Sequence, residues 1–311
     1  MRNTTRFALL ATFAVLSACG GDGTGPSDPV ASSLAVSAGS GQSATVGTAV
    51  AVAPAVTVKD QRGNGMAGVV VTFVVTAGGG ALIGDAADTT DAGGVARVSG
   101  WTLGTQTGNN TLTATVVSLT PVAITATATA GAPANLVFLT TAPATAQSGV
   151  AFSTQPALQL KDQFGNNVPQ AGVAVTAVIA TGGGTLGGTA TASTNASGVA
   201  TFTNLSLSGT VGARSLSFST SGLPALLSGG IQLNAGAPAT LAAVGATTLS
   251  GTAGLVVGSP IAVTVADQSG NPVAGATVTF VVTAGGGSLT GAVQSTDAAG
   301  QATLGSWTLG A

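Results

Sequence analysis

The stretch VVVTFVVTAGGG, residues 69–80, decides the expected fold of this chain. Its first eight residues are β-branched or aromatic and three glycines end it, a composition that favours a strand closed by a turn. Alternate side chains of a strand point to opposite faces, which places Val71, Phe73 and Val75 together on one face. We assign this face to the core of the protein.

Two further copies of this run show that the chain is built from repeats. They are VAVTAVIATGGG at residues 173–184 and ATVTFVVTAGGG at residues 276–287. A DQxGN motif precedes each copy, at Asp60, Asp162 and Asp267, with spacings of 102 and 105 residues. A second turn motif, TDAGG, TNASG or TDAAG, follows each copy.

Each repeat reads as short strands separated by turns rich in Gly, Asn, Asp and Pro. About seven such strands in about a hundred residues fit an immunoglobulin-like β-sandwich. We therefore predict an all-β chain of tandem Ig-like sandwiches in an elongated array, with domains at residues 30–131, 132–236 and 237–311. The joints AGAPANL and AGAPATL are short and each contains a proline, so neighbouring domains should be only moderately free to swing.

The second repeat differs from the others at one core position. Ala177 stands where Phe73 and Phe280 stand in the other copies. We expect another large residue, Phe202 or Phe138, to fill the space, because protein cores are close-packed.

The third repeat stops earlier than the first. Residues 296–310, TDAAGQATLGSWTLG, match residues 90–104, and the chain ends at Ala311, but the first repeat continues to residue 131 with what should be its last two strands. We therefore expect the third sandwich to be truncated before its last strands, and the sequence to be a fragment of a longer protein, because an open sandwich exposes core and strand edges. The alternative is that another chain supplies the missing strand.

The composition argues against several functions. The chain has no His and no Glu, one Cys, and nine Asp scattered along its length. Without the commonest general base and metal ligand, catalysis, a cofactor and a metal site are not expected. The seven Lys and Arg residues form no basic patch, so nucleic acid is not an expected partner either.

The N-terminus has the parts of a secretory signal: Arg2 and Arg6, then an apolar run over residues 7–16, then small residues. Leu16-Ser17-Ala18-Cys19 resembles the lipobox of bacterial lipoproteins, in which the signal is cut before the cysteine and the thiol is acylated. By this resemblance residues 1–18 are a lipoprotein signal peptide and Cys19 is the lipid attachment site. A free thiol beside an ordinary cleavage site is the alternative. Residues 19–29, with no apolar side chain to bury apart from the cysteine, are expected to form a flexible tether.

The motifs DQxGN, VxVTF, TAGGG, TDxxG and WTLG occur in this order within one repeat, which resembles the group-one bacterial Ig-like domains of the invasin and intimin type. The resemblance extends over nearly everything after the tether, and it is loosest in the second repeat, where Leu205-Ser206-Leu207 replaces Trp-Thr-Leu. It implies rod-forming spacer domains on a bacterial surface protein, with adhesion usually located in a separate tip domain.

The recurring Asp60, Asp162 and Asp267 allow two interpretations. A calcium site takes about six to eight oxygen ligands, whereas each motif offers one Asp and one Asn. The favoured interpretation is that Asp caps its own turn through backbone N–H groups while Gly and Asn accept positive φ. The glycine runs are followed by no helix and no Lys-Ser/Thr, so we expect them to let the chain cross between sheets and not to bind phosphate.

Trp101 and Trp307 occupy matching positions and could stack on a sugar or plug the end of a sandwich. Leu205 replaces them in the second repeat, which favours packing.

Three functions are compatible with the sequence. The leading hypothesis is a non-enzymatic, lipid-anchored rod of the bacterial cell envelope, at the outer membrane or cell surface, that holds something away from the membrane and supports adhesion. The second is a binding module whose loops recognise a glycan or a host-cell protein. The third is the stalk of a longer protein whose functional domain lies beyond residue 311. The sequence assigns no oligomeric state.

Overall fold

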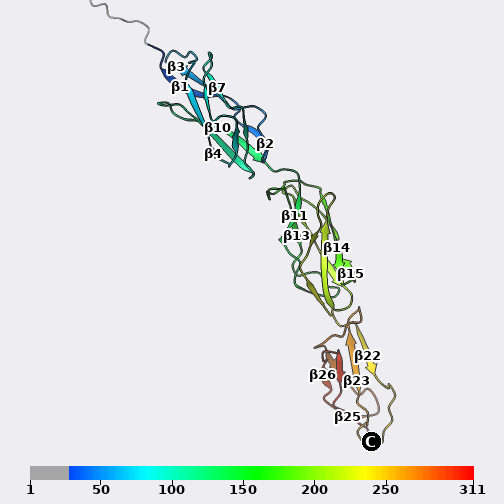
Figure 1. The fold of residues 1–311 in the computed structure, drawn as a ribbon. Coiled ribbons are helices and arrows are strands. Elements are labelled where there is room, and N and C mark those ends of the chain that lie inside the picture. The colour runs from blue at the N-terminus through cyan, green and yellow to red at the C-terminus, as the bar shows by residue number, and fades with distance from the viewer. Residues whose placement is uncertain (1–27) are drawn as a thin grey trace, which may run out of the picture.

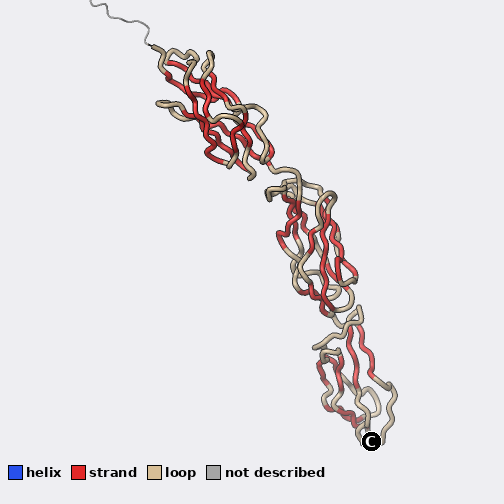
Figure 2. Tube along the Cα trace, in the orientation of Figure 1, coloured by secondary structure: helices blue, strands red, loops and turns tan. Residues whose placement is uncertain are grey.

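The protein is an end-to-end array of three β-structured bodies, as seen in a computed structural model that describes residues 28–311 (Figures 1 and 2). The three bodies follow one another in chain order, so the first body and Ala311 lie at opposite ends. Strands and loops make up the described residues, which confirms the predicted all-β tandem array. No helix among residues 28–311 is long and apolar enough to span a membrane. The predicted signal peptide and Cys19 lie outside the described residues.

The first domain consists of strands β1 to β10. Their bounds are β1 (Ala31–Ala38), β2 (Gln42–Thr45), β3 (Ala55–Asp60), β4 (Val70–Ala77), β5 (Ala81–Ile83), β6 (Ala87–Thr89), β7 (Val95–Arg97), β8 (Gly100–Thr102), β9 (Gly108–Thr115) and β10 (Val122–Thr129). A three-stranded sheet, β1-β3-β7, faces a five-stranded sheet, β2-β10-β9-β4-β6, and β5 pairs with β8. All pairs are antiparallel except β2 with β10, which run parallel.

The core of the first domain lies between these sheets. Val71 and Phe73 of β4 are buried and Val75 is half-buried, which confirms the face assigned to the core. Val56 and Val58 of β3 are buried in the same cluster from the opposite sheet. After β4, the glycine run leads into β5, which pairs outside the sheet of β4, as expected for a crossing segment.

The second domain repeats this architecture with strands β11 to β21. Their bounds are β11 (Asn135–Thr140), β12 (Thr145–Gln147), β13 (Ala157–Lys161), β14 (Ala174–Thr181), β15 (Thr185–Gly187), β16 (Thr191–Ser193), β17 (Val199–Thr201), β18 (Ser206–Ser208), β19 (Gly212–Ser219), β20 (Leu226–Leu227) and β21 (Ile231–Asn234). The sheets are β11-β13-β17 and β12-β21-β19-β14-β16, with β20 added on β19, and β15 pairs with β18.

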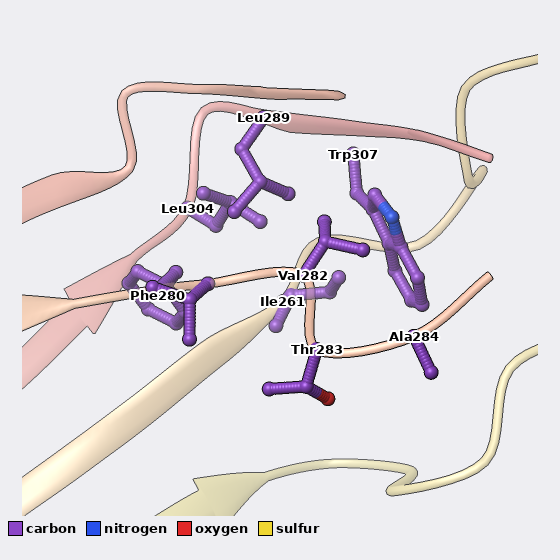
Figure 3. Close-up of a pocket in the computed structure, with 9 residues that line it drawn as sticks. Ile261, Phe280, Val282, Thr283, Ala284, Leu289, Leu304 and Trp307 are labelled. Carbon is purple, nitrogen blue, oxygen red and sulfur yellow. The ribbon is translucent and has the colours of Figure 1, made fainter. Parts of the chain in front are cut away.

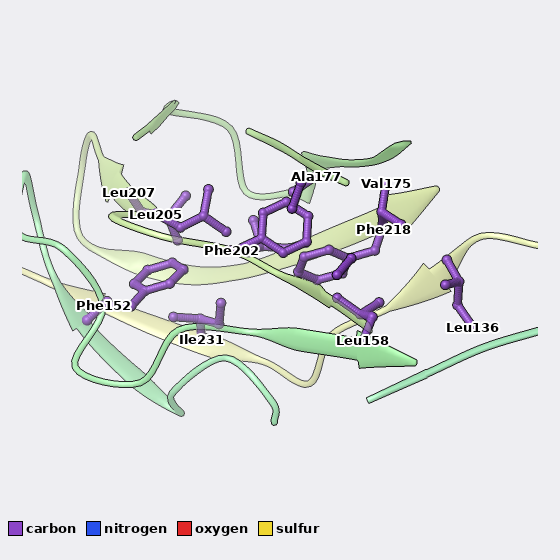
Figure 4. Packing of buried hydrophobic residues seen from close by; sticks show 14 of the residues in the cluster. Leu136, Phe152, Leu158, Val175, Ala177, Phe202, Leu205, Leu207, Phe218 and Ile231 are labelled. Atoms are coloured by element: carbon purple, nitrogen blue, oxygen red, sulfur yellow. The ribbon is translucent and has the colours of Figure 1, made fainter. Parts of the chain in front are cut away.

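A third phenylalanine, Phe218, joins the core around Ala177. Ala177 of β14 lies directly opposite Phe218 of β19, and Phe218 is fully buried (Figure 4). The first domain has the reverse pair, with Phe73 of β4 opposite Ala114 of β9. The large and small residues have therefore exchanged strands.

The two phenylalanines named from sequence pack around this residue. The ring centroid of Phe202 lies 5.2 Å from that of Phe218. The ring centroid of Phe138 lies 5.4 Å from that of Phe218, in an edge-to-face contact. Phe202 is fully buried and Phe138 is partly buried. Phe202 and Phe138, the two candidates named from the sequence, thus belong to the same phenylalanine cluster as Phe218, and Phe202 is buried in the core with Ala177.

The third domain consists of strands β22 to β28. Their bounds are β22 (Thr240–Val244), β23 (Ala262–Ala266), β24 (Thr277–Thr279), β25 (Gly287–Thr290), β26 (Val293–Ser295), β27 (Gln301–Thr303) and β28 (Ser306–Leu309). They form the sheet β22-β23-β27 and the pairs β24-β26 and β25-β28. Among residues 240–309 there is no counterpart of β9 and β10, in agreement with the expected incomplete sandwich.

The core of the third domain is open as a result. Its buried cluster consists of Val265, Val273, Val278 and Ala302. Beside it lies an apolar groove of about 270 Å³ (Figure 3). The groove is lined by Ile261, Phe280, Val282, Leu289, Leu304 and Trp307.

Candidate functional site: the joints between the domains

Each DQxGN motif forms a turn that its own aspartate caps. In the second domain, Oδ1 of Asp162 accepts hydrogen bonds from the backbone N–H groups of Phe164 and Asn166, both at 2.9 Å. The first and third copies repeat this pattern. Gly165 adopts positive φ (+85°), which a glycine accepts without steric cost. The predicted turn is confirmed, except that only the glycine, and not the asparagine, has positive φ.

The described residues hold no group of three or more His, Cys, Asp or Glu side chains that could bind a metal ion.

At the first joint the turn also binds the preceding domain. The Nδ2 group of Asn166 donates to the carbonyl of Thr105 at 2.8 Å, and the N–H of Thr107 donates to Oδ1 of Asn166 at 3.1 Å. The linker N–H of Gly131 donates to Oδ2 of Asp162 at 3.0 Å. One Asp–Asn pair thereby connects the linker, the end of the first domain and the turn of the second.

The second joint repeats these contacts. Asn271 donates to the carbonyl of Gly209 at 2.8 Å and accepts from the N–H of Val211 at 2.9 Å. The N–H of Gly236 donates to Oδ2 of Asp267 at 2.7 Å. We call the pairs Asp162–Asn166 and Asp267–Asn271, with these contacts, the joint latches.

In the first copy of the motif, the turn contacts no other domain among residues 28–311. Asn64 is exposed, whereas Asn166 and Asn271 are 6% and 3% exposed. Asn64 Nδ2 lies 3.4 Å from Oδ2 of Asp60, and the chain before β1 is held by Gln61 instead, whose side chain accepts from the N–H of Val30 and donates to the carbonyl of Asp28. Burial of the asparagine therefore comes from the joint and not from the turn.

Two buried side chains hold the conformation of the loops to which the latch asparagines are hydrogen-bonded. Asn110 accepts from the N–H of Gly104 at 3.0 Å and donates to the carbonyl of Gly108 at 3.2 Å, bracketing the loop between them. Arg214, at the corresponding position of the second domain, donates to the carbonyls of Thr210 and Ala213. Both loops therefore present a carbonyl and an N–H group to the next domain in a fixed geometry.

Hydrogen bonding keeps the latch carboxylates charged. Burial alone would raise the pKa of Asp162, but the side chain of Asn166, the N–H of Gly131 and the turn N–H groups donate to it and hold its pKa below the usual range. The pKa of Asp267 is lowered in the same way, with burial opposed by Asn271, Gly236 and the turn. Each carboxylate is thus a hydrogen-bond acceptor at neutral pH.

The comparisons with known proteins concern the fold. No protein-family model matches the chain, and no curated protein sequence matches it. The solved structure of FdeC, an Escherichia coli adhesin, is similar with a TM-score of 0.54 and 22% identity, over 90% of this chain and 91% of that one. The chain has the fold of the tandem Ig-like adhesins.

Two further solved structures are similar to the chain with TM-scores below 0.5. Invasin, an integrin-binding bacterial protein, has a TM-score of 0.35 and 21% identity, over 88% of this chain and 54% of invasin. InvD of Yersinia pseudotuberculosis has a TM-score of 0.44 and 16% identity, over 89% of this chain and 80% of its own.

The tryptophans have different surroundings in the two Ig-like domains that carry them. Trp101 is fully buried in the first domain, which confirms the packing interpretation for this residue. Trp307 is half-buried and lines the groove of the third domain (Figure 3). The indole Nε1 atoms of both are buried without a hydrogen-bond partner.

Sequence reasoning identified the turns but missed the asparagines. A signal was present, because β11 begins at the joint and pairs antiparallel with β13, which ends at the DQxGN turn. In such a pair the end of one strand lies beside the start of the other, so the motif had to lie at the joint.

Proposed function

We propose that the chain is an adhesion-type surface protein of the bacterial envelope in which the Ig-like domains act as an extended spacer without enzymatic activity. The observation that carries this proposal is the pair of joint latches. Inter-domain contacts within a chain are usually small and permit relative motion, whereas here the same Asp–Asn pair fastens both joints. Such a chain keeps its ends apart, which is the property that a spacer needs.

The reach of this spacer follows from strand geometry. Strands of up to eight residues rise about 3.3 Å per residue, so each body extends about 26 Å plus its loops. Three bodies in series reach on the order of 100 Å. Small-angle X-ray scattering on residues 19–311 should give a maximum dimension of this order, and a compact profile would contradict the spacer.

We further propose that residues 1–18 are a lipoprotein signal, that acylated Cys19 anchors the chain at the outer membrane or cell surface, and that residues 19–29 are the tether to domains 30–131, 132–236 and 237–311. Several acyl chains on one residue suffice for stable anchoring. In cells fed radiolabelled palmitate, the chain should be labelled and sediment with membranes, and Cys19→Ser should lose both properties. Membrane association of the unlabelled variant would overturn the anchor while leaving the spacer untouched.

A second candidate function is binding of a glycan or a host-cell protein by the domains themselves. The fold shared with the adhesin FdeC favours it. Residues 19–236 should be tested on glycan arrays and on host cells, with the same segment heated and cooled as a control for nonspecific adsorption. Specific binding would show that the domains are more than a spacer, and its absence would assign adhesion to another part of the protein.

A further inference from the structure

The two joints share the latch but differ in the side chain beside it. The third residue of the motif is Phe164 at the first joint and Ser269 at the second. Phe164 faces the preceding domain at Gly47, and Ser269 faces it at Ser148, next to the equivalent Gly149. Each glycine follows a short strand that runs parallel to the last strand of its domain. The two joints therefore share the latch and differ in the side chain at this position.

At the first joint this side chain lies against the preceding domain at Gly47. The ring of Phe164 lies so close to Gly47 that a Cβ atom on Gly47 would stand 3.2 Å from Cζ of the ring. Phe164 is still 37% exposed, so the contact with Gly47 covers only part of its side chain. A rigid ring in contact with the backbone resists bending of the joint toward that side, because bending would force the ring and the backbone atoms into overlap.

At the second joint the corresponding place is open. Ser269 contacts the second domain through its hydroxyl group: its Oγ lies 3.1 Å from Oγ of Ser148. Around this contact lies a crevice of about 540 Å³, lined by Ser148, Val150, Gly236, Pro238, Asp267 and Ser269. A crevice of this size admits water, and its polar lining can exchange the serine contact for hydrogen bonds to water.

We propose that the second joint is the hinge of the rod, and that the third residue of the DQxGN motif sets the stiffness of each joint. The latch is present at both joints. Beside it, the ring of Phe164 resists closure of the first joint. The crevice at Ser269, which the latch residues Gly236 and Asp267 also line, leaves room for closure of the second. The rod therefore bends between its second and third domains. This inference concerns the shape of the chain and is independent of the anchor and of adhesion.

Distance distributions between spin labels test the hinge directly. The labels are attached to cysteines introduced in a Cys19→Ser background. The pair Val74→Cys and Val178→Cys spans the first joint, and the pair Val178→Cys and Val293→Cys spans the second. The three valines are exposed, at 50%, 49% and 62% respectively. The distribution across the second joint should be broader than that across the first. Equal widths at the two joints would overturn the proposal.

A reciprocal exchange assigns the effect to the third residue. Ser269→Phe should narrow the distribution across the second joint to the width of the first, and Phe164→Ser should broaden the first to the width of the second. The matched control is Arg62→Ser, at the same position of the motif in the domain that follows no other domain, and it should change neither distribution. Circular dichroism melting checks that each variant is folded. If both exchanged variants are folded and neither distance distribution changes in width, the third residue does not set joint stiffness. If Ser269→Phe does not fold, the width of the distribution across the first joint in Phe164→Ser decides the outcome alone.

Discussion

At the scale of single residues, the second domain shows how one core accommodates two solutions. Phe73 opposite Ala114 in the first domain corresponds to Ala177 opposite Phe218 in the second. The pair occupies a similar volume in either order, since each strand contributes one large and one small side chain. Volume-conserving changes of this kind cost a core least.

We predict that Phe218→Ala lowers the free energy of unfolding of the second domain by about 3–5 kcal/mol, because a cavity opens above Ala177. The double variant Ala177→Phe/Phe218→Ala, which copies the arrangement of the first domain, should recover much of this loss. Urea unfolding of the chain measures both. Val178→Ala, at a half-exposed position on the same strand, is the control and should change stability by less than about 0.5 kcal/mol. A loss below about 1 kcal/mol for Phe218→Ala would refute this packing.

At the scale of elements, the two linkers differ in how closely they meet their surroundings. A Cβ atom on Gly236 would collide with the carbonyl oxygen of Ser148, whereas the nearest atom to a Cβ on Gly131 is Cβ of Asp162 at 3.6 Å, an ordinary contact. The glycine is therefore required for steric reasons at the second joint only.

We predict that Gly236→Ala displaces the second linker and exposes it to proteolysis, while Gly131→Ala leaves the first linker protected. The physical reason is the collision with backbone, which cannot move aside as a flexible side chain can. Limited proteolysis with a broad-specificity protease, followed by mass spectrometry of the fragments at several time points, locates the cleavage sites. Equal protection of both variants would show that the second joint has more room than its geometry indicates.

The groove of the third domain is the second feature at this scale. In the first domain, Phe73 and Trp101 are buried in one cluster with Leu112 of β9 and Ile124 of β10. In the third domain, Phe280 and Trp307 line an open groove instead. The groove therefore has the shape and the apolar lining to receive a strand pair of the same pattern.

We predict that appending a second copy of residues 106–131 after Ala311 closes this groove and protects the third domain from proteolysis, because alternate apolar side chains of the appended strands become buried. Limited proteolysis and the quenching of Trp307 fluorescence by acrylamide report the change. A copy with Asp in place of the inward Leu112 and Ile124 is the matched control and should protect nothing. Protection by both copies would mean that the effect does not come from packing in the groove.

At the scale of the whole molecule, the latches link the shape of the rod to the charge of two carboxylates. The pKa values of Asp162 and Asp267 are lowered in the folded chain. A lowered pKa means that the stabilisation is fully present above the ordinary value of about 3.9 and is lost as the pH falls through the folded value. Both joints should therefore loosen together in acid.

We predict that scattering profiles of the chain stay those of an extended rod from neutral pH down to about pH 4, and shift toward a flexible chain of beads below it. Circular dichroism at each pH separates loosening of the joints from unfolding of the domains. The double variant Asp162→Asn/Asp267→Asn should be flexible already at neutral pH and change little in acid. Asp60→Asn, in the turn of the first domain and outside both joints, should behave as the parent chain. A rod of unchanged stiffness in the double variant would show that the carboxylates do not hold the joints.

The sequence by itself determined the repeats, the strand faces and the turns, because each depends on short-range rules. The alternation of Val71, Phe73 and Val75 fixes a buried face, and DQxGN closes a turn through contacts that reach at most four residues along the chain. These rules act the same way in all three copies, so the motif pattern was sufficient to predict the Ig-like fold.

The tertiary structure alone decided which residues meet across the sheets and the joints. Phe218 opposite Ala177 depends on the register of two distant strands, and the hydrogen bonds of Asn166 depend on where the preceding domain ends. The first copy of the motif has the same Asp and Asn yet leaves Asn64 exposed, because a latch requires a neighbouring domain. The local sequence is enough to form the turn. Only the arrangement of the domains brings the asparagine of that turn into contact with a neighbouring domain.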